Sequence, residues 1–219
     1  MPLDDNDRTV IRPAAPAGAA LPVGTGLGEF VVVRVVGEGG FGIVYEAIDR
    51  TLQRHVAVKE FMPAALAARN ADGQVSVRSE RHRETFDTAL RSFVNEARLL
   101  AHFDHPALVK VHRFWEANGT AYMVMPLYDG LTLLDTLRNA ASAPSEALLM
   151  ALLGPLTEAL LVLHEQQCFH RDIAPDNILL LAGSGAPLLL DFGAARRVIG
   201  DMTQALTVIL KPGYAPIEQ

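Results

Sequence analysis

A glycine-rich stretch between two apolar, β-branched runs constrains the fold of this chain more than any other feature. The stretch is Gly37-Glu-Gly-Gly-Phe-Gly-Ile-Val44, with strand-like runs over 30–37 and 40–49. A third run follows over 55–61, so the pattern predicts an antiparallel β-meander. Taken alone, the glycines fit a plain hairpin turn as well as a loop that lies close to phosphate oxygens. A dinucleotide-binding motif is disfavoured because its glycines open a helix, whereas these join strand to strand.

The segments after the meander complete a small sheet and then become helical. Apolar residues at spacings of three and four predict a helix over 84–102. Asn118-Gly119 predicts a hairpin between strand runs over 108–116 and 120–127, which brings the sheet to five strands. Further helices are predicted over 131–140 and 145–166, and short strands over 177–181 and 187–190.

Composition excludes several classes of protein. Residues 1–26 are rich in proline, alanine and glycine and have no periodicity, so we expect a disordered leader. The net charge of -6 argues against nucleic acid or an anionic membrane as a partner. Cys168 is the only cysteine, which excludes an intrachain disulfide and favours the cytoplasm. The apolar segment 147–163 is short for a membrane span and is interrupted by glycine and proline, so it predicts a buried helix and no membrane contact.

Four short elements carry the candidate chemistry. Lys59 ends a Val-Ala-Val-Lys strand, and a helix glutamate such as Glu96 can pair with it and aim the ammonium group at phosphate oxygens. Taken singly, each of the two residues is better explained as a solvated surface charge. Asp172, in a His-Arg-Asp sequence, can accept a proton, while Asn177 and Asp191 offer the hard oxygen ligands that Mg²⁺ prefers. The joint order of all four elements indicates phosphoryl transfer.

This order resembles the eukaryotic-type protein kinase family, and within it the Ser/Thr kinases of bacteria, over residues 29–219. The resemblance implies an α+β, two-lobed fold with a five-stranded antiparallel N-lobe sheet, one N-lobe helix and an incomplete helical C-lobe. It divides the chain into a leader over 1–26, an N-lobe with its hinge over 27–128, and a partial C-lobe over 129–219 that runs through the end of the activation segment.

The resemblance also implies ATP and Mg²⁺ as cofactors and γ-phosphoryl transfer to Ser or Thr hydroxyls of protein substrates. In that reading Asp172 is the catalytic base, Lys59 and Glu96 form the positioning pair, and Asn177 and Asp191 bind the metal. The implied nucleotide-binding positions are Val36, Gly37, Gly39, Gly42, Val44, Ala57, Lys59, Met125, Pro126, Tyr128 and Leu179. Leu100, His170 and Phe192 take the positions of the family's apolar spine.

One departure from the family concerns a positive charge in the catalytic loop. Most Ser/Thr kinases have a lysine where this chain has Ala174, two residues after Asp172. Lys211 in turn stands where the family usually has a threonine that contacts the catalytic aspartate. Our hypothesis is that Lys211 is a catalytic residue that supplies the charge missing at Ala174. The alternative is a solvated Lys211 and a weaker catalytic loop.

Two other departures concern length. The stretch between Lys59 and Glu96 is longer than the family norm, and we expect a solvated loop there, with a regulatory docking surface as the alternative. The sequence stops at Gln219, where the family continues with further helices. We therefore expect a fragment of a longer protein, with apolar faces left uncovered over 145–166.

The function predicted from sequence is that of an ATP-dependent protein Ser/Thr kinase located in the cytoplasm. The alternative is a nucleotide-binding pseudokinase or an inactive fragment that acts as a regulatory or scaffold module, and a nicotinamide oxidoreductase is a more distant reading. The acidic leader around Thr9 resembles tails that forkhead-associated domains bind once they are phosphorylated, although the sequence favours a solubilising tail.

Overall fold

The chain divides into two compact units. The computed structural model describes residues 19–40, 42–170, 172–190 and 196–197. The first unit comprises 1–94 with 111–129, and the second comprises 95–110 with 130–219. The predicted lobe boundary after residue 128 lies one residue from the end of the first unit, but the segment 95–110 groups with the second unit.

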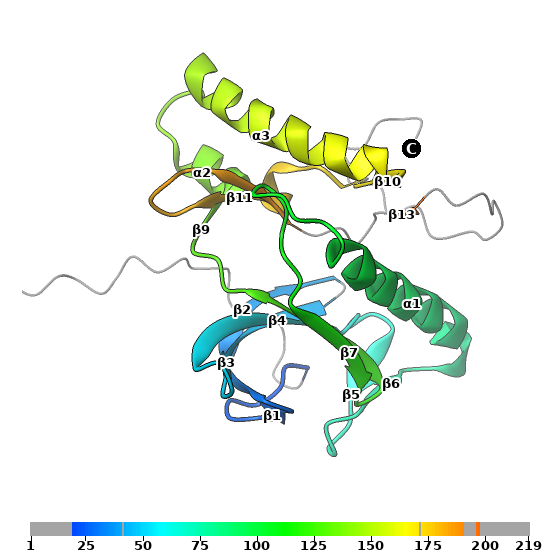
Figure 1. Cartoon of the computed structure of the whole chain (residues 1–219). Coiled ribbons are helices and arrows are strands. Elements are labelled where there is room, and N and C mark those ends of the chain that lie inside the picture. Colours follow the sequence, from blue (N-terminus) through cyan, green and yellow to red (C-terminus); the bar gives the residue numbers. More distant parts are fainter. Residues whose placement is uncertain (1–18, 41, 171, 191–195, 198–219) are drawn as a thin grey trace, which may run out of the picture. The chain divides into compact units, whose positions relative to one another are not determined.

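A six-stranded antiparallel sheet forms the first unit, with strands in the order β1-β2-β3-β4-β8-β7 (Figure 1). It contains the five predicted strands and adds a short edge strand, β1. Asn118 and Gly119 both have positive φ, 55° and 71°, which is the pair of left-handed residues that a tight two-residue hairpin requires, so the predicted hairpin is confirmed. The strands are β1 (Gly26–Leu27), β2 (Phe30–Gly39), β3 (Gly42–Asp49), β4 (Arg54–Phe61), β7 (Arg113–Ala117) and β8 (Thr120–Pro126).

The run predicted over 108–116 forms a sheet strand only from Arg113 onward. Its first part belongs to the second unit, where Leu108 forms an isolated parallel bridge with Leu189. The amide of Leu189 donates to the carbonyl of Ala107 at 2.8 Å, and the amide of Val109 donates back to Leu189 at 3.3 Å. These hydrogen bonds join residues that are far apart in the sequence. As a result, the run over 108–116 is divided between the two units.

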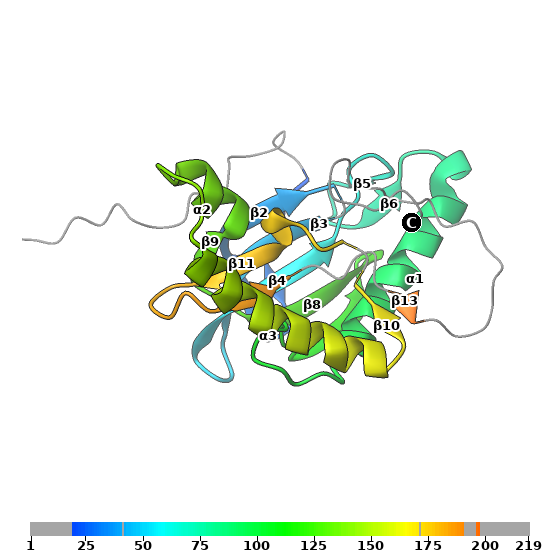
Figure 2. The ribbon, with the colours of Figure 1, turned by 90° about the horizontal axis from the view of Figure 1, so that it is seen from above.

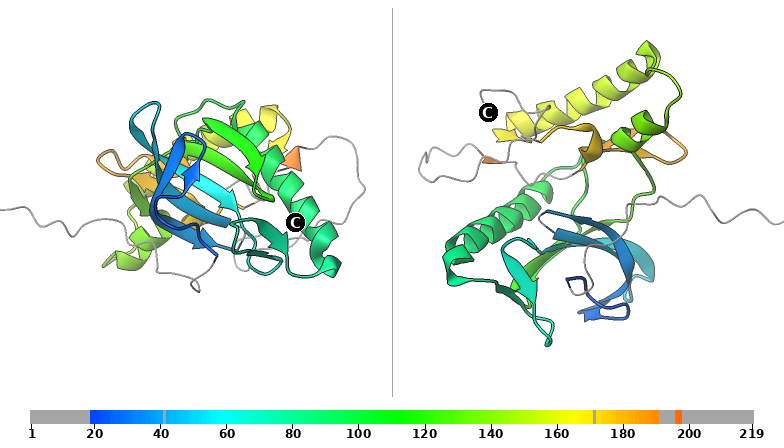
Figure 3. Two further views of the ribbon diagram at one scale, coloured as in Figure 1. Left: turned by 90° about the horizontal axis from the view of Figure 1, so that it is seen from below. Right: turned by 180° about the vertical axis from the view of Figure 1, so that it is seen from behind.

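The six-stranded sheet is strongly curled, as two further views show (Figure 3). Phe30 of β2 stacks on Trp115 of β7 with ring centroids 5.7 Å apart, and Glu29 and Arg113 form an ion pair beside them. Because β2 and β7 are not neighbours in the strand order, this contact defines a concave inner face of the sheet. Side chains alternate between faces along a strand and paired residues share a face. The inner face therefore carries Phe30, Val32, Tyr45, Ala47, Val58, Glu60, Trp115 and Tyr122.

Helix α1 (Arg83–Leu100) packs on the outer face of the sheet. It follows a short 3-10 turn, η1 (Glu80–His82), and the predicted helix over 84–102 is confirmed with its ends shifted by one or two residues. The ring of Phe61, at the end of β4, lies 5.3 Å from the ring of Phe86 and 5.7 Å from that of Phe93. Aromatic packing of this kind fixes the first part of the helix against β4.

The stretch between β4 and α1 forms a folded hairpin, so the prediction of a solvated loop is wrong for this part. Its strands are β5 (Ala67–Arg69) and β6 (Val75–Val77), and both Ala67 and Val75 are buried. The hairpin docks on the β7–β8 turn, where the Val75 amide donates to the Asn118 carbonyl at 2.8 Å. A Cβ atom added to Gly119 would lie 2.2 Å from the carbonyl oxygen of Val75, so this close approach requires glycine.

The end of the predicted leader is also folded. Residues 1–18 lie outside the described residues, but Leu21 is buried and Gly24 donates its amide to Val32 at 2.8 Å. The first unit therefore begins before the predicted boundary at residue 27. Proline, alanine and glycine predicted disorder there because they give no periodicity, yet a short segment needs only a few contacts with an existing sheet to be fixed.

The second unit combines two helices with a three-stranded sheet in the order β12-β11-β9. The predicted helices are both present, and their caps are hydroxyls: Thr132 accepts from the amide of Asp135 at 3.0 Å, and Ser145 accepts from Leu148 at 3.2 Å. Strand β10 also pairs with β13. The elements are β9 (Gly130–Thr132), α2 (Leu133–Asn139), α3 (Glu146–Glu165), β10 (Cys168–Phe169), η2 (Pro175–Asn177), β11 (Ile178–Leu181), β12 (Pro187–Leu189) and β13 (Arg196–Arg197).

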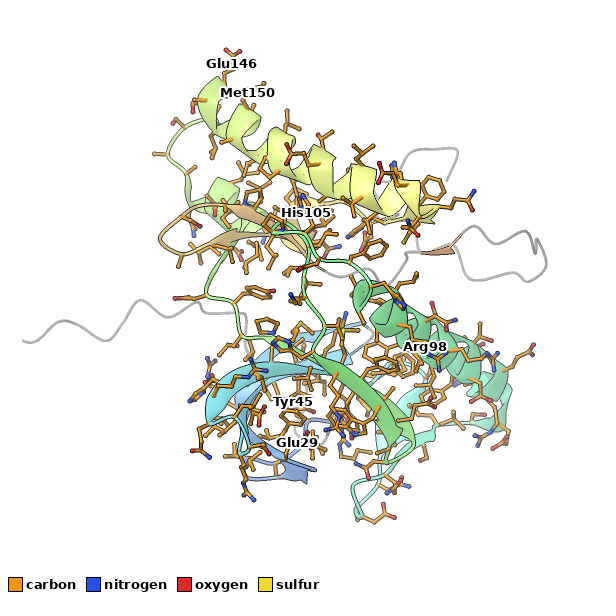
Figure 4. All side chains as sticks on the ribbon, viewed as in Figure 1. Glu29, Tyr45, Arg98, His105, Glu146 and Met150 are labelled. Atoms are coloured by element: carbon orange, nitrogen blue, oxygen red, sulfur yellow. The ribbon has the colours of Figure 1, made fainter. Side chains whose placement is uncertain are left out.

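Helix α3 lies along β10 and β12 (Figure 2), and the prediction of a buried helix is wrong for one of its sides. By length and composition alone it could cross a membrane, a test that core helices of soluble proteins also pass. Its buried residues are Leu152, Ala159 and Leu163. On its exposed side, Met150 projects near the start of the helix (Figure 4), and Leu149, Leu153 and Leu161 are also exposed. The exposed apolar residues on that side agree with the uncovered faces expected over 145–166.

Candidate functional site

Four of the predicted nucleotide-binding positions of the first unit lie on the outer face of the curled sheet. Val44 of β3 pairs with Lys59 of β4, and Ala57 of β4 pairs with Met125 of β8. Because paired side chains project on the same side of a sheet, these four residues share one face across three strands. Gly37 pairs with Val44, and Val36 lies just before Gly37 at an irregularity in the strand register. Pro126, the last residue of β8, pairs with Val56 on the inner face, and Tyr128 follows β8.

The glycines between β2 and β3 are required for different reasons. A Cβ atom on Gly42 would lie 2.2 Å from the carbonyl oxygen of Glu60, so packing against β4 alone demands glycine at this position. Gly39 pairs with Gly42, yet a Cβ atom on Gly39 would meet no described atom within 4 Å. Protein packing leaves Gly39 unexplained, which is the situation expected where a backbone must lie close to a ligand.

Lys59 lies beside the helix that carries Glu96. Its ammonium nitrogen is 5.9 Å from the ring centroid of Phe93 on α1, a cation–π distance. Glu96 follows Phe93 by three residues and is buried, with 4% of its surface exposed. Residues three apart lie on the same side of a helix, so Phe93 and Glu96 project from one face of α1.

In the second unit, a short hydrogen-bond network organises the segment after β10. The amide of Asp172 donates to His170 Nδ1 at 3.3 Å, so the proton of this imidazole is on Nε2, which donates to the Leu190 carbonyl at 3.1 Å. Asn177 Nδ2 donates to Asp172 twice, to the carboxylate oxygen Oδ2 at 2.7 Å and to the main-chain carbonyl at 2.9 Å. Histidine and asparagine together therefore fix both the backbone and the carboxylate of Asp172.

This network leaves the amide oxygen of Asn177 as its remaining ligand atom, because both hydrogen bonds to Asp172 use its nitrogen. The main chain of Asn177 is held as well, since its amide donates to Ala174 at 2.9 Å and its carbonyl accepts from Leu190 at 2.8 Å. Chemically, the segment presents a carboxylate suited to accept a proton beside an oxygen ligand suited to a hard cation.

The comparison with protein families agrees with this arrangement. A model described as the protein kinase domain matches residues 30–218. This chain belongs to the protein kinase family. In this kinase domain the strands β1 to β4, β7 and β8 belong to the first unit, and the Asp172–Asn177 pair belongs to the second.

The relatives of this kinase domain are bacterial Ser/Thr kinases. It is 33% identical over 198 residues to the serine/threonine-protein kinase pkn2 of Myxococcus xanthus, and 32% identical over 203 residues to PknJ of Mycobacterium tuberculosis. These alignments cover 88% and 90% of this chain but only 21% and 31% of the relatives, so the chain spans between about a fifth and a third of their length. A solved structure described as the PpkA-294 apo form is 48% identical, with a TM-score of 0.80 over 91% of this chain and 70% of the other.

The structure does not bring every predicted site residue into view. Leu179 lies on β11 opposite Thr132, and Leu100 and His170 are each 1% exposed, as predicted for positions in an apolar spine. Asp191, Phe192, Lys211 and Thr9 lie outside the described residues.

Sequence reasoning missed a charged cluster inside the curled sheet. Glu60, next to Lys59 on β4, is fully buried and pairs with Arg69 of the β5–β6 hairpin at 2.6 Å. The hydroxyl of Tyr45 donates to the same carboxylate oxygen at 2.7 Å. Strand alternation could have indicated this cluster, because it places Glu60 on the same apolar face as Val58 and Tyr45.

The cluster perturbs the acidity of its members. Burial first, and the Glu60 carboxylate second, raise the pKa of the Tyr45 phenol. The same two causes raise the pKa of Tyr122 to about 12. Burial opposes the charge of Arg69, but the hydrogen bond and charge of Glu60 outweigh it and raise the pKa of the guanidinium. Arg69 is therefore charged inside the protein at neutral pH.

Proposed function

We propose that this domain transfers the γ-phosphoryl group of ATP to Ser or Thr hydroxyls of protein substrates. The observation that carries the proposal is the Asp172–Asn177 pair, in which two hydrogen bonds from one amide fix the carboxylate and its backbone. A carboxylate held in this way can orient a substrate hydroxyl and take its proton. Positioning supplies much of the catalysis in phosphoryl transfer, because the transition state demands little covalent chemistry of the protein.

The residues fit a nucleotide with a divalent metal. Members of the protein kinase family use ATP and such a metal, and the bound metal supplies charge stabilisation to the phosphate oxygens. In our proposal Asn177 and Asp191 hold it through oxygen atoms. Lys59 binds phosphate oxygens and Glu96 orients it, while Gly37, Gly39 and Gly42 let the backbone cover the phosphates. The open space around Gly39 supports this role. Val36, Val44, Ala57, Met125, Pro126, Tyr128 and Leu179 surround the adenine.

We test the activity by incubating the chain with radiolabelled ATP, Mg²⁺ and a general protein substrate. The expected result is transfer of label to Ser and Thr, lost on Asp172→Asn. Nucleotide binding, measured with a fluorescent ATP analogue, is expected to survive Asp172→Asn, because this residue acts on the hydroxyl. Binding without turnover in the unaltered chain would instead support the regulatory pseudokinase reading.

A finer proposal is that Lys211 supplies the positive charge missing at Ala174. It is supported by the small, uncharged side chain of Ala174, which stands just before η2 and two residues after Asp172. Lys211→Ala should lower kcat far more than nucleotide affinity. The double change Ala174→Lys with Lys211→Thr should recover activity, and full activity in Lys211→Ala would contradict the proposal.

The remaining proposals concern partners and location. We propose a cytoplasmic location, supported by a single buried cysteine, Cys168, and by the need for ATP. We also propose that the leader, once phosphorylated at Thr9, binds a forkhead-associated domain. Loss of that binding in Thr9→Ala, measured with the phosphorylated full chain, would support it.

A further inference from the structure

Two neighbouring residues on β4 face opposite sides of the curled sheet. Lys59 is on the outer face, where its ammonium lies over Phe93. Glu60 is on the inner face, where its carboxylate accepts a hydrogen bond from Tyr45. Because the two share a peptide bond in a paired strand, whatever fixes Glu60 on the inside also constrains the backbone that presents Lys59 on the outside.

Two side chains from separate segments of the first unit, Tyr45 and Arg69, meet at the Glu60 carboxylate, and both also bond to the segment at residues 19–21. We call this group the Glu60 cluster: Glu60, Arg69 and Tyr45 with the main chain of Ala19, Leu21 and Gly73. Tyr45 accepts from the Leu21 amide at 3.0 Å and donates to Glu60. Arg69 donates to Glu60 from Nη2 at 2.6 Å, to the Ala19 carbonyl from Nε at 2.9 Å, and to Gly73 from Nη1 at 3.0 Å.

These hydrogen bonds form a closed ring of contacts. The segment at residues 19–21 is tied to Tyr45 on one side and to Arg69 on the other, and both of those side chains end on the same oxygen of Glu60. Tyr45 lies in the middle of the curled sheet (Figure 4), so this ring of hydrogen bonds includes a residue of the sheet's core. The β5–β6 hairpin and the segment at residues 19–21 therefore act on β4 through one carboxylate.

Burying the charges of the cluster has a large desolvation cost. Glu60 is 0% exposed and the side chain of Arg69 is 5% exposed, so both charges have lost their water. The second carboxylate oxygen, Oε1, is buried and has no hydrogen-bond partner among the described residues. Buried ion pairs of this kind are often no more stabilising than well-packed apolar residues of similar volume. Stability alone is thus a poor reason for the pair, whereas the fixed geometry of its hydrogen bonds is specific.

We propose that Arg69 is a positioning residue for Lys59, which acts through Glu60 to hold β4 in the register that binds the nucleotide. This inference rests on the proposed function, because it assigns Lys59 to phosphate oxygens. It gives the β5–β6 hairpin a role in nucleotide binding without any contact between the hairpin and the nucleotide.

The rival explanation is that the cluster only stabilises the first unit, and a pair of variants separates the two. Arg69→Met leaves the Glu60 charge buried and unpaired, so it lowers stability whichever explanation holds. The double variant Glu60→Leu with Arg69→Leu removes both charges and is expected to recover much of the melting temperature. Arg54→Met is the matched control, because Arg54 lies on the same strand, is half exposed, and has only a 3.9 Å contact with Asp49.

Four quantities are measured for each variant of this chain: the melting temperature, KM for Mg²⁺-ATP, kcat, and the rate at which an amine-acylating reagent labels Lys59, read by mass spectrometry. We expect the double variant to melt near the unaltered chain but to keep a KM raised about three- to tenfold, with a smaller change in kcat. The labelling rate of Lys59 should change at least twofold in both cluster variants and stay constant in Arg54→Met.

Recovery of KM together with melting temperature in the double variant would overturn the inference, because the cluster would then be structural only. If the double variant does not fold, Arg69→Lys is compared with Arg69→Met. A melting temperature close to that of the unaltered chain with a KM that stays raised supports positioning. Return of both the melting temperature and KM to the values of the unaltered chain contradicts it. If the unaltered chain transfers no phosphate, the proposed function fails separately. The acylation rate of Lys59 then decides alone, and an unchanged rate in Arg69→Met would refute the inference.

Discussion

Two carboxylates on neighbouring strands of the first unit show how differently one fold uses the same chemistry. Glu60 on β4 is bonded to an arginine and a tyrosine on the inner face of the sheet, with the arginine only 5% exposed. Glu46 on β3 is bonded to Arg34 at 2.7 Å and His55 at 2.6 Å on the outer face, where both partners are more than half exposed. The contact distances are nearly equal, and the access of water is the main difference.

That difference decides what each cluster contributes. Exposed ion pairs contribute little, because water and salt screen them and two long side chains must be ordered. A buried pair contributes little net stability as a unit, yet removing one partner leaves a charge that no water can solvate. The inner cluster should therefore respond strongly to single changes and the outer cluster weakly.

The largest expected effect is that of Glu60→Gln. The change keeps the side-chain shape but leaves Arg69 charged and without its ion pair in the core, so we expect a loss of about 3–5 kcal/mol in the free energy of unfolding. Urea denaturation measures it, with Glu46→Gln as the matched control. Equal losses in the two variants would remove the distinction between inner and outer clusters.

The second effect concerns the docking of the hairpin that carries Arg69. Gly119→Ala places a methyl group against the Val75 carbonyl at a residue with φ of 71°, and we expect a loss of roughly 1–3 kcal/mol or more. Gly73→Ala, in the β5–β6 hairpin itself, is the control. Gly73 has φ of 84°, but no described atom lies within 4 Å of the added carbon. If both variants lose the same stability, backbone strain alone explains the result and the close docking does not.

A third and smaller effect is a loss of stability at alkaline pH. The pKa of Tyr122 is raised to about 12 from 10.0, mainly by burial and then by Glu60. Above pH 10 the unfolded tyrosine loses its proton while the folded one keeps it, so stability should fall as the pH rises from 10 toward 12. Urea denaturation across this range should show a shallower fall in Tyr122→Phe, and an unchanged slope would contradict the assignment.

The smallest effect is expected for the outer cluster. Glu46→Gln should cost about 0.2–1 kcal/mol, and the cost should shrink as salt is raised, because Arg34 and His55 face water. Urea denaturation at low and high ionic strength measures both features. A large, salt-independent loss would mean that the outer cluster behaves like the inner one.

Local patterns in the sequence predicted most of the secondary structure and the loop that holds Asp172. The hairpin at Asn118-Gly119, the helix start at Ser145 and the strand that ends near Lys59 each depend on a few adjacent residues, so the sequence was sufficient. Predictions failed where distant segments decide the outcome. The β5–β6 hairpin reads as a solvated loop because it contains turn residues at Asn70-Ala-Asp-Gly73 and basic side chains. It folds because it forms hydrogen bonds with the β7–β8 turn and with Glu60.

By itself, the sequence determined the order of the kinase motifs and the alternation that places Lys59 and Glu60 on opposite faces of one strand. Only the tertiary structure decided that Glu60 would meet Arg69 and Tyr45 within the curl of the sheet. The reason is physical. Alternation along a strand is a local property of the backbone, whereas burial of a charge depends on which distant segments close over it.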